Sequence, residues 1–289
     1  MTFQRQTIDR RELLRKTTLT LAGAGLGLGA TASQGAVWPP TGGHDEVTRD
    51  RILRQRSIPV FRHTVVRTYP HDRMSYTEGL VMVGGSIYEG TGLYGQSKLL
   101  QWDLASGRIL NQFNLDRHYF GEGVTVFNGV IHQMTYIENA RYTYDQRTFR
   151  RTGETRYETQ GWGMTHDDVN LITSNGSSAI MFRDAQSFDV VRTIYVSDDV
   201  GPVGFLNELE YVDGVIYANI WQTNFLAKID ATTGKIIGWI DLTGLNPFPS
   251  ILVYPFVLNG IAVNTSTGRL LVTGKCWPNL YEINLIQIR

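Results

Sequence analysis

Short runs of alternating apolar and polar residues fill most of the chain, and they come in pairs separated by tight turns. In LVMVGGSIYEG and VTVFNGVIHQM, for example, two such runs flank Gly84-Gly85 and Asn128-Gly129. Dipeptides of this kind between alternating runs predict β-hairpins, because both central residues of the turn need a positive φ. The unit recurs about five times between Gly79 and the C-terminus, with further turns at 168–170, 213–214 and 265–268.

A second kind of turn follows each of the first four hairpins and begins at an aspartate, whose side chain can cap its own turn. These aspartates are Asp103, Asp145, Asp184 and Asp230. The two kinds of turn divide the chain into repeats of roughly 40–50 residues with four short strands each, a period typical of β-propellers. The sequence therefore predicts an all-β fold, a five-bladed β-propeller over residues 58–289.

The fifth repeat ends before it has a fourth strand, whereas a β-like run, IPVFRHTVVRTYP (58–70), precedes the first repeat. An N-terminal strand that pairs with the last blade would close the ring and leave no exposed edge there. We therefore expect residues around 60–68 to complete the last blade.

Composition excludes several classes of protein. The 289 residues contain 27 basic and 27 acidic side chains, so net charge gives no reason to expect binding to nucleic acid or to an anionic membrane. Cys276 is the single cysteine, which excludes an internal disulfide and a Cys-rich metal cluster. We expect a monomer.

The first forty residues do not follow the β pattern. Arg10-Arg11 lies in a charged run, an uncharged Gly- and Ala-rich stretch follows, and Ala30-Thr31-Ala32 resembles a cleavage site. This arrangement over residues 1–36 resembles a bacterial twin-arginine export signal and predicts a periplasmic or secreted protein without a membrane attachment after export. An ordinary secretory signal and an uncleaved anchor are the alternatives. Residues 37–57 are interpreted as a linker.

Ligands of a propeller collect at the mouth of its central channel, where the loops that enter and leave the inner strands converge. In this chain those segments are rich in polar and aromatic residues, namely 76–79, 120–123, 161–163, 207–210, 219–222 and 273–278. Carboxylates, amides, a lysine and tryptophans thus recur at equivalent places. The pattern favours a polar site at one mouth of the channel.

The same segments carry a family resemblance. Residues 65–286 resemble the plant and bacterial type of glutaminyl-peptide cyclotransferase, or glutaminyl cyclase, through YTEGL, YFGEG, GWGM, LNELEY and TGKCWPNLYEI. The resemblance implies a five-bladed propeller that converts N-terminal glutaminyl residues of peptides and proteins to pyroglutamyl residues with release of ammonia. It also implies that no cofactor is required.

The reaction needs an unprotonated α-amine, donors for the oxyanion and a proton for the leaving nitrogen. By the resemblance, Glu122 matches the catalytic glutamate, which takes a proton from the amine and returns it to the leaving group. Lys275 and Asn207 match polar residues that could hold the amide oxygen. Trp162 and Trp221 match aromatic walls of the pocket. A turn-capping role for Glu122 and a simple ion pair for Lys275 are the alternatives.

Three further positions depart from the family pattern but are expected to contact the substrate. Tyr76 stands where the plant enzymes have phenylalanine, Glu78 where they have glutamine, and Tyr136 where they have tryptophan. Because Glu78 belongs to a different repeat from Glu122, we expect no second carboxylate near Glu122.

Other polar groups admit different interpretations. Glu208 and Glu210 share one face of a strand and could bond to backbone amides of the channel or to a structural cation. His166, Asp167 and Asp168 resemble a metal group but fall at a hairpin turn. Two other function classes stay open, a non-catalytic exported propeller that binds peptide ends or small ligands and a metal-dependent lactonase. Trp102, Trp239 and Trp277 are assigned to packing between strands.

Overall fold

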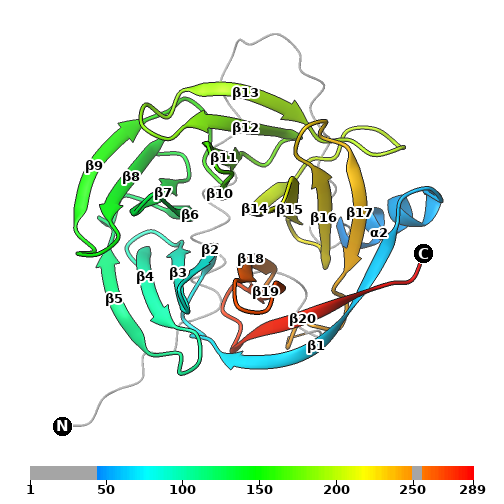
Figure 1. Ribbon diagram of the computed structural model, residues 1–289, viewed down its shortest axis with the longest axis horizontal. Helices are drawn as coiled ribbons and strands as arrows, with labels where there is room; N and C mark the ends of the chain where they lie inside the picture. Colours follow the sequence, from blue (N-terminus) through cyan, green and yellow to red (C-terminus); the bar gives the residue numbers. More distant parts are fainter. Residues whose placement is uncertain (1–43, 249–255) are drawn as a thin grey trace. The chain divides into compact units, whose positions relative to one another are not determined.

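The computed structural model describes residues 44–248 and 256–289 (Figure 1). The predicted export signal over residues 1–36 and the first part of the predicted linker lie outside these residues. Apart from one helix, α2 (His44–Arg54), the regular elements described are strands. No helix among the described residues is long and apolar enough to cross a lipid bilayer.

Three antiparallel sheets of four strands follow one another along the chain, each in simple up-and-down order. The first sheet contains β2 (Thr77–Val83), β3 (Ser86–Thr91), β4 (Lys98–Asp103) and β5 (Ile109–Asn114). The second contains β6 (Gly121–Phe127), β7 (Val130–Thr135), β8 (Ala140–Asp145) and β9 (Arg151–Arg156). The third contains β10 (Met164–His166), β11 (Asn170–Ser174), β12 (Ala179–Asp184) and β13 (Val190–Tyr195).

The remaining strands form one eight-stranded sheet with two four-stranded halves. One half contains β14 (Leu206–Val212), β15 (Val215–Ile220), β16 (Phe225–Asp230) and β17 (Ile236–Asp241). The other contains β18 (Leu258–Asn264), β19 (Arg269–Gly274), β20 (Asn279–Gln287) and β1 (Val60–Pro70). A short parallel contact between β1 and β17 joins the halves.

We call each four-stranded antiparallel sheet, and each half of the eight-stranded sheet, a meander, and the first strands of the successive meanders lie innermost. Figure 1 shows β2, β6, β10, β14 and β18 around a common centre, with the later strands of each meander farther out. Each inner strand contacts the next, and β18 contacts β2, which completes the circle. The predicted all-β propeller is confirmed, while the number of blades stays a prediction.

The turns have the chemistry that the sequence predicts. Asn128 and Gly129 have φ angles of 50° and 77°, and Asp213 and Gly214 have 47° and 84°. These positive values fit the two-residue turns of β-hairpins. In the second kind of turn the aspartate caps the backbone, as where Asp145 Oδ1 accepts a hydrogen bond of 2.7 Å from the Thr148 amide.

The expected closure by an N-terminal strand is confirmed. β1 pairs antiparallel with β20 from Phe61↔Gln287 to Pro70↔Asn279, and Figure 1 shows the two strands side by side. His71, directly after β1, lies 2.8 Å from the Trp277 carbonyl and 3.2 Å from the Glu89 carboxylate of the first sheet. The end of the closing strand thus links the last meander to the first.

Part of the predicted linker is instead an ordered helix. The Arg51 guanidinium of α2 makes two hydrogen bonds of 2.5 and 2.6 Å to the Asp198 carboxylate. Ile52 is buried in the same apolar cluster as Val60 and Trp239. Described residues of the 37–57 segment therefore pack on the propeller rather than linking it loosely to another part, which corrects the sequence interpretation.

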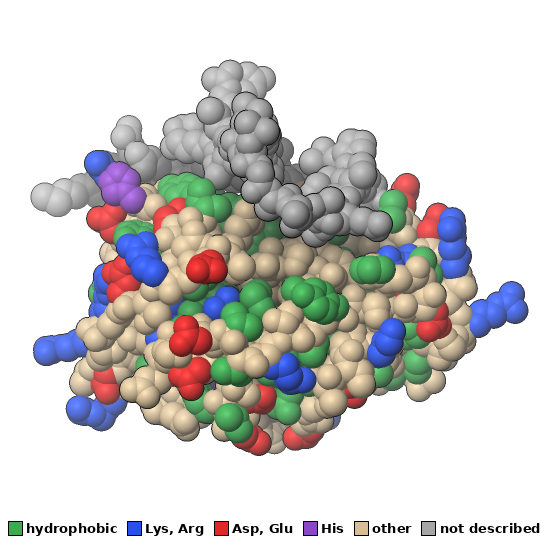
Figure 2. Space-filling view, turned by 90° about the horizontal axis from the view of Figure 1, so that it is seen from above, with side chains coloured by type: hydrophobic (Ala, Val, Ile, Leu, Met, Phe, Trp, Pro, Cys, Tyr) green, Lys and Arg blue, Asp and Glu red, His purple; other side chains and the backbone are tan. Residues whose placement is uncertain are grey.

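Packing of the sheets uses the residues that the sequence assigned to it. Trp102, Trp239 and Trp277 are all buried between strands. On the surface visible in Figure 2, acidic and basic side chains are interspersed rather than gathered by sign. This mixture agrees with the balanced composition of the chain.

Candidate active site

Some of the innermost strands approach one another so closely that they require glycine near their starts. A Cβ atom on Gly79 would collide with the Val124 amide of β6, and one on Gly123 would collide with the backbone just before β10. Gly79, Gly123 and Gly163 directly follow Glu78, Glu122 and Trp162, so these three residues are held at the same end of the channel. Asn207 and Asn259 occupy the equivalent places on β14 and β18, and the Asn207 carbonyl is the atom that a Cβ on Gly163 would meet.

A recurring backbone hydrogen bond brings a second set of side chains to this end. In each case the donor is the backbone amide of the residue directly after the second strand of a meander. The acceptor is the carbonyl of the residue directly before the first strand of the same meander. The bonds are Gly92 N to Tyr76 O (2.8 Å), Tyr136 N to Phe120 O (2.9 Å), Trp221 N to Phe205 O (2.9 Å) and Lys275 N to Val257 O (2.9 Å).

Two carboxyl groups and one ammonium group meet in this mouth. The Lys275 ammonium donates a hydrogen bond to Glu78, and the Glu78 and Glu122 carboxyl groups share a hydrogen bond. The three side chains are buried, with 2% of Glu78, 5% of Glu122 and 4% of Lys275 exposed. The expectation that Glu122 has no carboxylate nearby was wrong, because neighbouring repeats place their equivalent residues side by side around the channel.

Burial dominates the electrostatics of this cluster. Burial raises the pKa of Glu122 well above its ordinary value, and the negative charge of Glu78 raises it further, while Lys275 opposes the shift. Burial also raises the pKa of Glu78, but the adjacent Lys275 ammonium favours its ionised form. Burial and the charge of Glu78 therefore favour the protonated form of Glu122, and the Lys275 ammonium favours the ionised form of Glu78.

Aromatic rings enclose the acid pair. The Lys275 ammonium lies 4.5 Å from the centre of the Tyr76 ring, and Phe120 packs against Tyr76 at 6.2 Å and against Tyr136 at 5.9 Å. Burial and the charges of the nearby carboxylates raise the pKa of Tyr136 to about 12, so its hydroxyl stays protonated.

Across the mouth, Trp162 and Trp221 meet edge to face with ring centres 5.6 Å apart. The two tryptophans come from consecutive meanders, as expected for walls of one pocket. The structure thus brings together both sequence-predicted tryptophans.

Two amides complete the mouth. Asn207 is buried, and its Oδ1 atom has no hydrogen-bond partner among the described residues. Asn259 donates to Glu78 Oε2 at 3.2 Å and to the Thr77 carbonyl at 2.9 Å. Asn259 and Phe120 are two residues of this mouth whose roles were not predicted from the sequence. The signal for Asn259 is the motif LNGI, which places it where YTEGL has Glu78.

Glu208 and Glu210 bond to backbone amides deeper in the channel, one of the roles proposed from the sequence. Glu208 accepts from the amides of Leu80 at 3.2 Å and Ile261 at 2.6 Å, and Glu210 accepts from Val263 at 2.9 Å. Burial raises the pKa of Glu208 well above its ordinary value and that of Glu210 to about 8. These carboxyl groups connect three inner strands.

The candidate metal group at the hairpin turn has a local structural role. Asp167 Oδ1 accepts hydrogen bonds from the amides of Val169 and Asn170, and His166 bonds to Thr125. Over residues 44–248 and 256–289, no group of three or more His, Cys, Asp or Glu side chains is arranged to hold a metal ion.

The fold and site define a β-propeller whose channel mouth holds a buried acid pair between aromatic walls. The sequence matches the family model described as glutamine cyclotransferase over residues 43–285. A glutaminyl-peptide cyclotransferase of Arabidopsis thaliana is 36% identical over 229 residues, which are 77% of this chain and 71% of that protein. The crystal structure of Myxococcus xanthus glutaminyl cyclase matches with a TM-score of 0.75 and 33% identity, over 80% of this chain and 100% of that one. The chain therefore belongs to the glutamine cyclotransferase family.

Proposed function

We propose that this protein is a glutaminyl-peptide cyclotransferase, which converts N-terminal glutaminyl residues of peptides and proteins to pyroglutamyl residues and releases ammonia. Family membership supports the reaction. The observation that carries the mechanism is the buried Glu78–Glu122–Lys275 cluster between aromatic walls.

In the proposed mechanism, Glu122 moves the one proton that must change places, and its raised pKa favours a protonated starting form rather than the base expected from the sequence. The neutral α-amine attacks the γ-amide carbon, and Glu122 gives its proton to the departing nitrogen, which leaves as ammonia. The new ring nitrogen then returns a proton to Glu122. The carboxyl group finishes in its starting state, so no external acid or base is consumed.

Lys275 and Asn207 are the groups proposed to hold the γ-amide oxygen as it gains negative charge. A buried ammonium stabilises the negative charge on this oxygen more strongly than an exposed ammonium does, because little water screens the interaction. Glu78 and Tyr76 position this ammonium through the ion pair and the contact with the ring face. The Oδ1 atom of Asn207, which has no partner among the described residues, can only accept a hydrogen bond, so the proposed donor to the γ-amide oxygen is the Nδ2 group.

Trp162, Trp221 and Tyr136 are proposed to enclose the glutaminyl side chain and keep water from the tetrahedral intermediate. Exclusion of water protects the γ-carbon from hydrolysis, which would give glutamate instead of the ring. The mechanism uses no cofactor.

The experiment that tests this function is an ammonia-release assay on a glutaminyl dipeptide, with and without a chelator. We expect release of ammonia and formation of pyroglutamate at the same rate in both conditions. Loss of activity with chelator would contradict the cofactor-free mechanism, and binding without turnover would contradict the enzymatic function.

We also propose that the protein is exported, with residues 1–36 as a twin-arginine-like signal, and acts as a monomer in the periplasm or outside the cell. The paired Arg10-Arg11 and the uncharged stretch after it support this proposal. Replacing both arginines with lysine should retain the protein in the cytoplasm, as measured by cell fractionation. Continued export of that variant would favour an ordinary secretory signal.

A further inference from the structure

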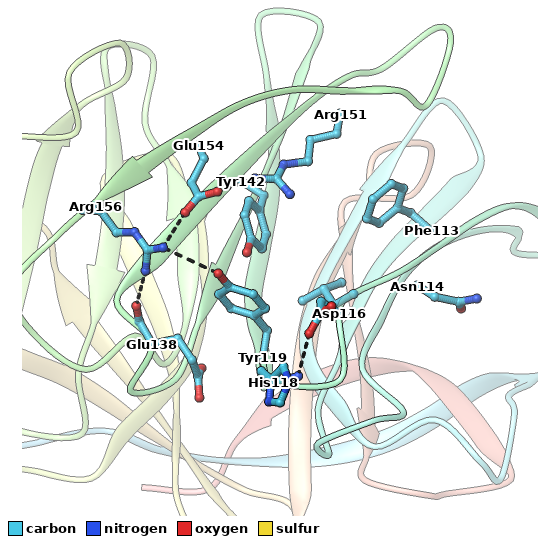
Figure 3. A pocket seen from close by; sticks show the side chains of 11 residues that line it. Phe113, Asn114, Asp116, His118, Tyr119, Glu138, Tyr142, Arg151, Glu154 and Arg156 are labelled. Atoms are coloured by element: carbon cyan, nitrogen blue, oxygen red, sulfur yellow. Dashed lines mark hydrogen bonds and ion pairs between the residues drawn. The ribbon is translucent and has the colours of Figure 1, made fainter.

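Beside the aromatic wall of the candidate active site lies a cavity of about 840 Å³ between the first and second sheets (Figure 3). We name it the outer groove and define it by Phe113, Asp116, Tyr119, Glu138, Glu154 and Arg156. We propose that the outer groove binds the residues that follow the N-terminal glutamine of a peptide substrate. This inference rests on the proposed cyclotransferase activity.

The outer groove and the active site share a wall. Tyr119 lines the groove, and the next residue, Phe120, packs against Tyr76 and Tyr136 of the active site. The carboxylate of Glu138 accepts hydrogen bonds from the Phe120 amide at 3.3 Å and from the Tyr94 hydroxyl at 2.7 Å. Its charge also contributes to the raised pKa of Glu122, so the groove begins close to the reacting groups.

Arg156 holds this shared wall in place from the groove side. Its guanidinium donates to the Glu138 carbonyl at 2.8 Å and the Tyr119 hydroxyl at 3.5 Å, and pairs with Glu154 at 2.7 Å, as the dashed lines in Figure 3 show. The Arg156 side chain nevertheless remains 61% exposed. It can therefore contact a bound peptide while it positions Tyr119 and Glu138.

The geometry of the substrate requires an exit from the pocket. Cyclisation uses the α-amine and the γ-amide of the glutaminyl residue, so its α-carbonyl and the rest of the peptide must leave the enclosed mouth. A pocket of several hundred cubic ångströms that continues from the aromatic wall has the size typical of small-ligand sites and can accept the next side chain or two.

The lining of the groove indicates which side chains it accepts. Tyr119 and Tyr142 meet edge to face at 5.4 Å and offer aromatic surface. The carboxylates of Asp116, Glu138 and Glu154 outnumber the two arginines of the groove, Arg151 and Arg156, and both arginines already pair with Glu154. Aromatic or basic residues after the glutamine should therefore bind better than acidic ones.

The test compares kcat/KM for glutamine amide, Gln-Phe-Ala amide and Gln-Glu-Ala amide, in the full-length protein and in variants. In the unaltered enzyme we expect Gln-Phe-Ala amide to be the best of the three. Arg156→Ala should lower kcat/KM for Gln-Phe-Ala amide by about fivefold or more, mainly through KM, and should lower it for glutamine amide by a clearly smaller factor. Arg147→Ala, a control in the exposed turn between β8 and β9, should leave all three values unchanged.

Glu154→Gln provides an independent measurement that does not depend on the folding of Arg156→Ala. Removing this carboxylate should raise kcat/KM for Gln-Glu-Ala amide relative to Gln-Phe-Ala amide. Equal values for short and extended substrates in the unaltered enzyme, or an equal loss for both in Arg156→Ala, would overturn the assignment of the groove. No ammonia from glutamine amide would instead refute the proposed function, and the groove assignment with it.

Discussion

At the scale of single residues, the buried pair of Glu78 and Glu122 carboxyl groups is the central chemical feature. A glutamine at position 122 keeps the shape of the side chain and can still bond to Glu78, but it cannot transfer a proton. We therefore expect Glu122→Gln to retain its melting temperature and substrate affinity and to lose on the order of a hundredfold or more in kcat. Ammonia release under saturating substrate measures this loss.

A comparison with Glu78→Gln shows whether the proton-transfer role belongs to Glu122 or to Glu78. If Glu122→Gln keeps nearly full activity while Glu78→Gln is inactive, then Glu78 is the group that transfers the proton.

A second prediction concerns the pH dependence of the reaction. The negative charge of Glu78 raises the pKa of Glu122, so Glu78→Gln should lower that pKa, and the freed Lys275 charge should lower it further. In the proposed mechanism Glu122 acts in its protonated form, and it would then lose its proton at a lower pH. We expect the alkaline limb of the kcat/KM profile to move to lower pH in Glu78→Gln. Asp168→Asn, at an exposed turn, serves as the control.

An unmoved alkaline limb in Glu78→Gln would show that Glu78 does not influence the proton of Glu122. The acidic limb belongs to the α-amine of the substrate, which titrates near pH 8, and should stay in place in both variants.

Glu122 and the two tryptophans could be proposed from the sequence, but the way in which the site residues meet could not. Glu78, Glu122 and Asn259 occupy equivalent places in different repeats, and only the circular arrangement of the inner strands makes such places adjacent. Phe120 was missed because a phenylalanine beside a glycine has no signal that separates a pocket wall from the core.

At the scale of elements, β1 determines whether the last meander is complete. Deleting residues 58–70 would leave the β20 edge unpaired and remove Val60 and Tyr69 from the core. We expect the deletion to abolish cooperative folding, as measured by thermal denaturation followed by circular dichroism. A soluble truncated protein with a cooperative transition would contradict the role of β1.

Deleting residues 44–54 is the matched control for the loss of β1. It removes α2 with its Arg51–Asp198 pair and the buried Ile52, but leaves every strand pairing intact. We expect this variant to fold with a lower melting temperature.

Hairpins were predictable because their turns carry local chemistry, as Asn128-Gly129 and Asp145 show. Helix α2 was not, because its sequence, HDEVTRDRILR, has little apolar character. Its order comes from contacts with Asp198 and with the core, which lie far away along the chain. Tertiary contacts of this kind leave no local signal.

At the scale of the whole molecule, buried carboxyl groups in the channel should make stability depend on pH. Burial raises the pKa of Glu210 from 4.5 to about 8. A carboxyl group with a higher pKa in the folded state contributes full stability below its unfolded pKa and loses that contribution as pH rises through the folded pKa. The free energy of unfolding should therefore fall between about pH 4.5 and pH 8, by on the order of 3–5 kcal/mol from this group.

Urea denaturation at pH 5.5 and pH 8.5 measures this dependence, with Glu210→Gln as the test variant. Glutamine keeps an acceptor for the Val263 amide but does not ionise, so the difference between the two pH values should shrink. An unchanged difference would assign the pH dependence to other groups, such as His71, whose pKa is raised by its contact with Glu89.

The pairing of β1 with β20 also has a consequence for how the protein is made. Of the described strands, β1 is the first to be synthesised and its partner β20 is the last. Contacts between such distant segments form slowly, because a long loop must close before they contribute any stability. The nascent chain can build its inner meanders in order, yet it keeps an open ring and an unpaired strand until β20 has been synthesised. Translation of the final repeat therefore sets the earliest moment at which this domain becomes stable.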